Sequence, residues 1–190
     1  MIARTTVLGV ALIVMIGAAT QAQAERQAED DFSSPGLYAG LGFAVGFENF
    51  DILGSIDMGT PVGFDSWLGY RVIPNLAAEL ELGYLNGFES GQAPSSLGLD
   101  VLAFTGNLKA YLLTGRVQPF VLVGIGLTDF ILSAPRSDHE TDFAARFGGG
   151  IDVYLTESFA LQLKSSYMLT TGDLDGGDYV DLTFGGQIRF

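Results

Sequence analysis

The sequence contains no cysteine, few cations and little charge of either sign. Without cysteine the chain can form no structural disulfide, no cysteine-ligated zinc site and no lipid anchor on a cysteine behind a cleavage site. Lysine and arginine number 9 against 22 aspartates and glutamates, and this net charge of −13 argues against a nucleic-acid partner. Charged residues make up 16% of the chain, against roughly 25% in an average soluble domain. If the whole surface of this protein met water, that surface would be unusually poor in charge.

Long apolar runs are also scarce, and the main one lies near the start of the chain. Arg4 precedes the apolar run Val7–Ala19, which is followed by Ala22-Gln23-Ala24. This order is typical of a secretory signal peptide with an A-x-A cleavage site, and the run is shorter than the roughly 20 residues that a membrane-spanning helix needs. The sequence therefore predicts a cleaved signal peptide over residues 1–24. We expect residues 25–35, which are acidic at their start, to form a flexible N-terminal segment.

From residue 36 onward, large apolar side chains alternate with small or polar ones. In the first such segment Leu37, Leu41 and Phe43 share one face, while Gly40 and Gly42 share the other. A period of two predicts strands. Eight strands are predicted: Leu37–Phe47, Val62–Val72, Ala77–Gly87, Leu99–Leu112, Pro119–Leu127, Phe143–Leu155, Phe159–Thr170 and Tyr179–Phe190.

The predicted connections alternate in length. Short joins fall near residues 73–75, 114–116 and 156–158, whereas long ones span roughly 48–61, 88–98, 128–142 and 171–178. In an up-and-down arrangement every long loop then emerges at the same end. Short turns at one end and long loops at the other are typical of bacterial outer-membrane barrels, with the short turns in the periplasm.

Alternation alone leaves two barrels open, since a soluble barrel of the lipocalin kind would turn its apolar face inward. The second face decides between them. A water-facing surface would carry many lysines and glutamates, but this face is mostly glycine, alanine, serine and threonine. Small residues suit a narrow lumen that must hold side chains from eight strands. We therefore predict an all-β, eight-stranded antiparallel up-and-down transmembrane barrel over residues 36–190, with its apolar face toward lipid.

Several short motifs resemble the small outer-membrane β-barrel family related to the outer-membrane protein A transmembrane domain and the opacity-type surface antigens. They are Gly36–Phe43, Leu68–Arg71 followed by Pro74–Ala77, Gln118–Val121, and Gly148–Asp152. The resemblance implies a porin-like, multi-pass protein of the cell envelope in the bacterial outer membrane, with both termini in the periplasm. It also implies contact with outer-membrane lipid and lipopolysaccharide, and with the barrel-assembly machinery, for which the terminal Phe190 looks like the C-terminal aromatic signal. Members of this family are mostly structural or surface-contact proteins.

Ten charged residues share the inward face of the predicted strands, five of each sign. They are Asp65, Glu79, Glu81, Asp152 and Asp181, with Arg71, Lys109, Arg146, Lys164 and Arg189. We expect an ionic network that plugs the lumen, with Glu79 and Glu81 near Lys109 and Asp152 near Lys164. The alternative is a narrow ion path gated by those pairs, as in a small passive channel.

The long loops are predicted to be acidic. Their carboxylates are Asp51, Asp57, Glu89, Asp129, Asp138, Glu140, Asp142, Asp173, Asp175 and Asp178. Asp173, Asp175 and Asp178 surround a glycine pair and could hold a divalent cation through oxygen ligands, although the distal glutamate of a helical calcium loop is missing. A merely solvated acidic loop is the alternative.

The single histidine, His139, is predicted in the longest acidic loop. It lacks the following serine of the His-x-Ser arrangement that barrel lipid A deacylases use, although Ser133 or Ser137 could supply a nucleophile across loops. We therefore predict no enzymatic activity and no cofactor, with a loop-borne lipid or peptide hydrolase as the third hypothesis. The sequence favours a structural or surface-interaction role through acidic extracellular loops.

Overall fold

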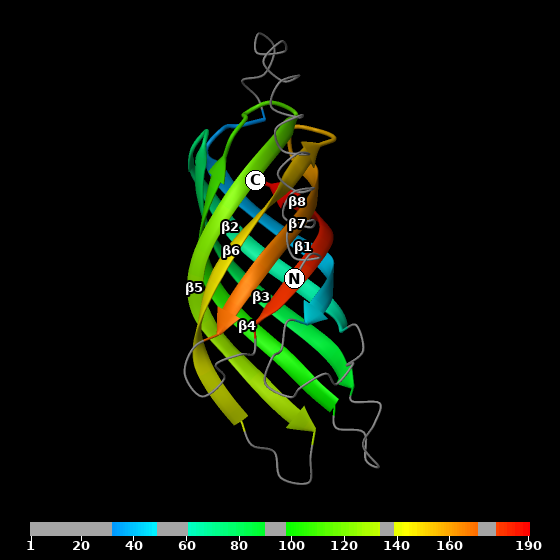
Figure 1. Ribbon diagram of the computed structural model, residues 1–190. Helices are drawn as coiled ribbons and strands as arrows, with labels where there is room; N and C mark the ends of the chain where they lie inside the picture. Colours follow the sequence, from blue (N-terminus) through cyan, green and yellow to red (C-terminus); the bar gives the residue numbers. More distant parts are fainter. Residues whose placement is uncertain (1–31, 49–60, 90–97, 134–138, 171–177) are drawn as a thin grey trace, which may run out of the picture.

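Eight antiparallel strands form a sheet that closes on itself (Figure 1). The computed structural model describes residues 32–48, 61–89, 98–133, 139–170 and 178–190. The strands are β1 (Gly36–Glu48), β2 (Val62–Ile73), β3 (Leu76–Glu89), β4 (Gly98–Tyr111), β5 (Val117–Ser133), β6 (His139–Tyr154), β7 (Phe159–Thr170) and β8 (Tyr179–Arg189). Each strand pairs with the next, and β1 pairs with β8 from Tyr38 opposite Arg189 to Glu48 opposite Tyr179. A closed sheet leaves no unpaired strand edge, which is the condition for a sheet in hydrocarbon. The predicted fold is confirmed.

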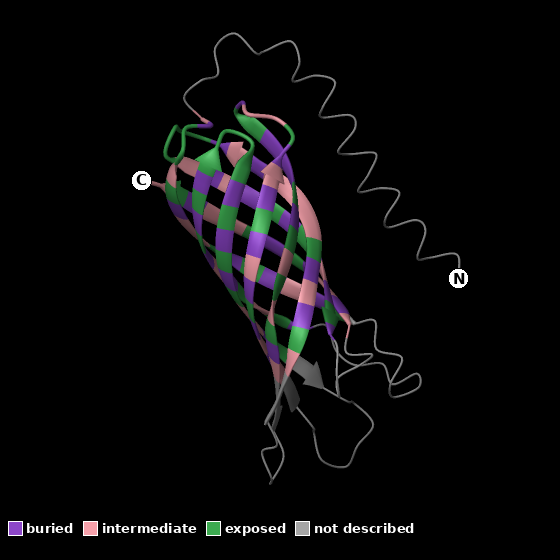
Figure 2. Ribbon diagram, turned by 90° about the vertical axis from the view of Figure 1, so that its left-hand side faces the viewer, coloured by how far each residue is buried: buried purple, intermediate pink, exposed green. Residues whose placement is uncertain are grey.

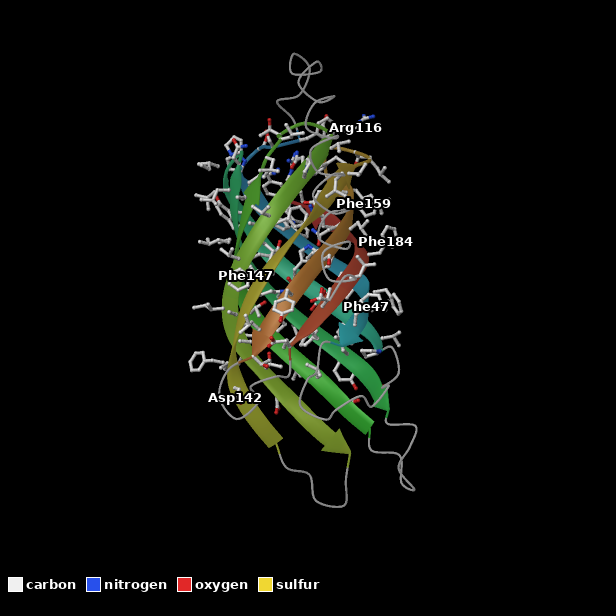
Figure 3. All side chains as sticks on the ribbon, in the orientation of Figure 1. Phe47, Arg116, Asp142, Phe147, Phe159 and Phe184 are labelled. Carbon is white, nitrogen blue, oxygen red and sulfur yellow. The ribbon has the colours of Figure 1, made fainter. Side chains whose placement is uncertain are left out.

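The alternation along each strand separates an apolar outer face from a polar lumen. Leu41 and Ile125 are 61% and 72% exposed, whereas Lys109 and Thr105 are completely buried. The bands of buried and exposed residues alternate along the strands in Figure 2. Figure 3 shows Phe47 and Phe184 extending away from the barrel wall. Exposed leucine and phenylalanine in this density would be costly in water and are suited to lipid.

Two glycines fit opposite large aromatic rings in the lumen wall. Trp67 on β2 lies opposite Gly40 on β1, and Tyr38 on β1 lies opposite Gly69 on β2. A Cβ atom on Gly40 would lie 2.2 Å from the Trp67 ring, and one on Gly69 would lie 2.2 Å from the Tyr38 ring. Glycine at these two positions therefore lets the rings lie flat against the wall of a narrow barrel.

The short connections and both ends of the described barrel lie at one end, here called the short-turn end. It holds the β2–β3, β4–β5 and β6–β7 turns, the start of β1 and the end of β8. In Figure 1 this end is at the top, and β3 to β6 extend furthest toward the opposite, loop end. The predicted alternation of short and long connections holds except between β5 and β6, where the connection spans residues 134–138 and is no longer than the β4–β5 turn over residues 112–116.

The prediction was wrong about the length of the third long loop. It placed residues 128–142 outside the strands, but β5 continues to Ser133 and β6 begins at His139, with Ile131 opposite His139. Polar residues such as Asp129 and Asp142 interrupt the apolar pattern, yet a hairpin can continue beyond an apolar band because the two strands satisfy each other's backbone groups.

His139 therefore belongs to a strand, and so do several carboxylates that were predicted in loops: Glu89 in β3, Asp129 in β5, and Glu140 and Asp142 in β6. Asp51, Asp57, Asp138, Asp173 and Asp175 lie outside the described residues. Among the residues that the structure describes, no helix is long and apolar enough to cross a membrane.

Candidate functional site

The lumen brings together most of the charged residues that were predicted to face inward. Nine of the ten are buried at 4% exposure or less. The tenth, Arg189, is half-buried near the short-turn end, with its guanidinium carbon 5.8 Å from the centre of the Tyr154 ring. Eight of these residues form two clusters, the Lys109 cluster and the Arg146–Lys164 cluster, and Arg71 lies between the first cluster and the short-turn end.

The Lys109 cluster consists of Lys109, Glu79 and Asp152 with the polar side chains around them. The Lys109 ammonium lies 3.2 Å from Asp152 Oδ2 and 3.6 Å from Glu79 Oε2. Tyr38 donates its hydroxyl to Glu79 at 2.8 Å. Asp152 also accepts hydrogen bonds from Tyr111, Gln162 and Gln187, at 3.3, 2.9 and 3.2 Å. Both carboxylates therefore have donors besides the lysine, as a buried charge requires.

The Arg146–Lys164 cluster comprises Arg146 and Lys164 with Asp65, Glu81 and Asp181. Arg146 Nη1 lies 2.6 Å from Glu81, and Arg146 Nη2 lies 3.1 Å from Asp181 and 3.8 Å from Asp65. Lys164 contacts Glu81 and lies 3.3 Å from Asp65.

Neutral side chains complete this cluster. Thr183 donates to Asp65 at 2.5 Å, and Ser166 donates to Asp181 at 2.6 Å. The Lys164 ammonium also lies 5.4 Å from the Trp67 ring, and the Trp67 indole donates to Gln187 of the Lys109 cluster. The two clusters are therefore joined through the middle of the lumen.

The predicted pairing is correct for Glu79 and wrong for two other carboxylates. Glu81 contacts Lys164 and Arg146 rather than Lys109, and Asp152 contacts Lys109 rather than Lys164. The prediction considered neighbouring strands only. In a narrow lumen long side chains reach strands that are not adjacent, so that Lys109 on β4 meets β6, and Lys164 on β7 meets β3.

Several neutral side chains that the sequence did not mark as functional also lie in the lumen. Tyr38, Trp67, Tyr111, Gln118, Gln162 and Gln187 are all buried in the lumen. In the sequence they are marked only by their positions in the alternating pattern, which place them on the same face of the strands as the charged residues. Toward the loop end the lumen becomes apolar, with Ala44, Leu85, Val101, Ala103, Ala144, Met168 and Tyr179 in one buried cluster.

Of the predicted metal-binding aspartates, only Asp178 belongs to the described residues. Its carboxylate accepts hydrogen bonds from the Tyr167 hydroxyl at 2.6 Å and from the Thr170 backbone at 3.1 Å. These donors tie β7 to the residue before β8. The described ranges contain no group of three or more histidines, cysteines or carboxylates arranged for a metal ion.

Phe190 follows β8 directly. Its backbone N–H donates to the Leu37 carbonyl at 2.9 Å, and its side chain is 76% exposed. The last residue therefore stays attached to β1 while its ring remains on the outside.

A closed eight-stranded barrel with an apolar outer face and a charged lumen defines an integral outer-membrane β-barrel protein. The profile of the outer membrane protein beta-barrel domain matches residues 9–190. The chain belongs to this family, and its place is the bacterial outer membrane. A sequence search of curated proteins finds no significant match.

Solved structures of small outer-membrane barrels share the fold. Neisserial surface protein A has a TM-score of 0.65 at 15% identity, over 81% of this chain and 97% of that chain. OprG from Pseudomonas aeruginosa has a TM-score of 0.62 at 15% identity, over 84% and 98%. Ail, the attachment invasion locus protein of Yersinia pestis, has a TM-score of 0.60 at 15% identity, over 83% and 99%, in a complex with the heparin analogue sucrose octasulfate. At this identity the likeness concerns the fold alone.

Proposed function

We propose that the protein is a structural and surface-interaction barrel whose lumen is closed to ions by the two charged clusters. The observation that carries this proposal is the burial of the clusters, in which Lys109, Arg146 and Lys164 each contact at least two carboxylates. The interior of an eight-stranded barrel is just wide enough for its own side chains. An ion could pass only by displacing buried charges from their partners, which costs several kcal/mol for each charge.

Single-channel recording in planar bilayers tests the closed lumen. We expect no discrete conductance from the parent protein, with insertion verified by heat-modifiable gel migration. A matched variant, Glu81→Ala/Arg146→Ala, removes one charge of each sign and long side chains from the middle of the lumen. We expect it to conduct. Discrete conductance steps in the parent would contradict the proposal and would favour the second candidate, a small passive channel.

The surface role rests on the charge of the loop end. The sequence of the predicted long loops includes the ten carboxylates named above and a single lysine or arginine, Arg136. Ail was crystallised with a sulfated, polyanionic heparin analogue, and a strongly acidic loop end is unsuited to such a ligand. The partner that fits this chain is cationic: a basic protein surface or divalent cations shared with lipopolysaccharide.

Binding to protein embedded in lipid nanodiscs distinguishes these ligands. We expect a polylysine peptide to bind at low ionic strength and to be released by salt. We expect sucrose octasulfate not to bind. The opposite order of affinities would contradict the cationic partner without affecting the closed lumen.

The remaining assignments follow from family and topology. Both ends of the described barrel lie at the short-turn end, which supports a periplasmic position for both termini. We further propose contact with the barrel-assembly machinery through Phe190, a cleaved signal peptide over residues 1–24, and no enzymatic activity. Protease access to intact cells tests the orientation, because only the loop end should be cut from outside.

A further inference from the structure

The residues just before β1 cover the short-turn end of the lumen. Phe32 and Ser33, here called the Phe32 latch, lie next to the barrel wall, and Ser33 is only 7% exposed. The Phe32 ring lies 5.7 Å from the Tyr154 ring on β6, and the guanidinium of Arg116, from the β4–β5 turn, lies 5.6 Å from the Phe32 ring. Figure 3 shows Arg116 at this end of the barrel. The latch thus contacts parts of the chain that are far from it in sequence.

Two buried lumen side chains hold the latch by its backbone. The Phe32 carbonyl accepts hydrogen bonds from Arg71 Nη1 at 3.0 Å and from Gln118 Nε2 at 3.2 Å. Gln118 is completely buried, and it also donates to the carbonyls of Thr114 and Gly115 in the β4–β5 turn. One amide group therefore joins the latch to the turn.

Arg71 depends on the latch for one of its few partners. It is 1% exposed, and no carboxylate lies within 4.0 Å of it in the described part of the chain. Its Nη2 donates to Gln118 Oε1 at 2.5 Å, and its Nε has no hydrogen-bond partner. A buried guanidinium with only neutral acceptors is held weakly compared with an ion pair. Among the nine buried charged residues of the lumen, Arg71 is therefore the one most readily released to water.

The latch also covers the path to the Lys109 cluster. The Arg71 guanidinium stacks 3.8 Å from the centre of the Tyr111 ring, and the Lys109 ammonium lies 5.3 Å from the same ring. Tyr111 in turn donates to Asp152. The order from the short-turn end into the lumen is thus the Phe32 latch, then Arg71, then Tyr111 and then Lys109.

We propose that the Phe32 latch is a lid that closes the lumen at the short-turn end and keeps Arg71 from water. The proposal rests on the closed lumen proposed above and adds a second closure, separate from the charged clusters. Opening the lid exposes Arg71 and the aromatic layer beneath it, while the Arg146–Lys164 cluster stays in place. Conduction by the Glu81→Ala/Arg146→Ala variant then also depends on opening of the lid, and adding Phe32→Gly to that variant should raise its conductance.

The absence of cysteine makes a direct test possible, because an introduced cysteine is the only thiol. Ala160 on β7 is completely buried and lies opposite Tyr154, the residue that the Phe32 ring contacts. The probe is the rate at which a charged methanethiosulfonate reagent labels Ala160→Cys in the folded, lipid-embedded protein. Ala44→Cys, completely buried in the apolar cluster toward the loop end, is the internal control, and exposed Glu157→Cys gives the unhindered rate.

Two further changes open the lid in different ways. Phe32→Gly removes the ring, and Arg71→Met removes a donor to the Phe32 carbonyl without leaving a carboxylate unpaired. Phe32→Gly should speed labelling of Ala160→Cys by about two- to tenfold, which is the effect of one aromatic contact on a local opening equilibrium. Arg71→Met should speed it by about tenfold, because it removes a hydrogen bond from a charged group. Ser34→Gly, at an exposed neighbouring position, should leave the rate unchanged.

The outcomes separate the two proposals. Slow labelling in the parent and fast labelling in both lid variants, with Ala44→Cys unchanged, supports the lid. Equal, slow rates in the parent and both lid variants overturn the lid and leave the closed lumen standing. Labelling of Ala160→Cys in the parent at the rate of Glu157→Cys also overturns the lid, whereas the closed lumen is overturned only by discrete conductance of the parent. Faster labelling of Ala44→Cys in the lid variants also overturns the lid, since it would show general loosening.

Discussion

Replacing Lys109 by methionine tests whether the charged clusters contribute to stability. The change keeps the length of the side chain but leaves Glu79 and Asp152 without their shared cation, 3.6 and 3.2 Å away. Breaking a buried ion pair by removing one partner costs about 3–5 kcal/mol. The Tyr38, Tyr111, Gln162 and Gln187 donors remain, so we expect a loss near the lower limit, about 3 kcal/mol of unfolding free energy.

Reversible urea unfolding in lipid vesicles measures this loss. The single tryptophan, Trp67, lies in the lumen, and its emission reports unfolding. Glu157→Ala, in an exposed turn, is the control and should change the free energy by less than about 0.5 kcal/mol. Glu79→Gln combined with Lys109→Met should recover part of the loss, because one of the two unpaired charges is then gone. A loss below about 1 kcal/mol for Lys109→Met alone would show that the ion pairs of Lys109 do not stabilise the barrel.

The wall and the outer face give two further predictions. Gly69→Val places a branched side chain where a Cβ atom already lies 2.2 Å from the Tyr38 ring, and we expect a loss of about 1–3 kcal/mol in the same unfolding assay. Gly106, where a Cβ atom would meet nothing closer than 3.9 Å, is the matched position, and an equal loss for Gly106→Val would contradict the ring-packing account. Leu41→Arg places a charge in the middle of β1 on the outer face, and in bilayers it should cost about 2–4 kcal/mol. A neutral effect would show that this face does not meet hydrocarbon.

The sequence predicts the barrel well because one physical constraint acts on every strand. A wall one residue thick between lipid and a narrow lumen forces a period of two, and the pattern is readable from β1 to β8 without knowledge of distant contacts. The pattern is less informative beyond the apolar band. There Asp129 and Asp142 suggest a loop, while backbone pairing continues the β5–β6 hairpin to Ser133 and His139.

The lumen shows what the alternation of residues along the strands can and cannot predict. The alternation along each strand indicates which charged residues face inward, and nine of these ten residues are buried. It cannot indicate partners, because a contact such as Lys109 with Asp152 joins strands that do not pair with each other. The Phe32 latch was beyond prediction for a different reason. Phe32 lies outside any alternating pattern, in a segment expected to be flexible, and only the folded chain brings Arg71 and Gln118 to its carbonyl.

The most direct test of the orientation of the wall uses fluorescence quenching by lipids brominated on their acyl chains. Two proteins are compared: the parent, whose only tryptophan is Trp67 in the lumen, and Phe43→Trp/Trp67→Phe, whose only tryptophan lies on the outer face. If the outer face meets hydrocarbon, quenching is strong in the second protein and much weaker in the first. Stronger quenching of Trp67 than of the tryptophan at position 43 would contradict this orientation.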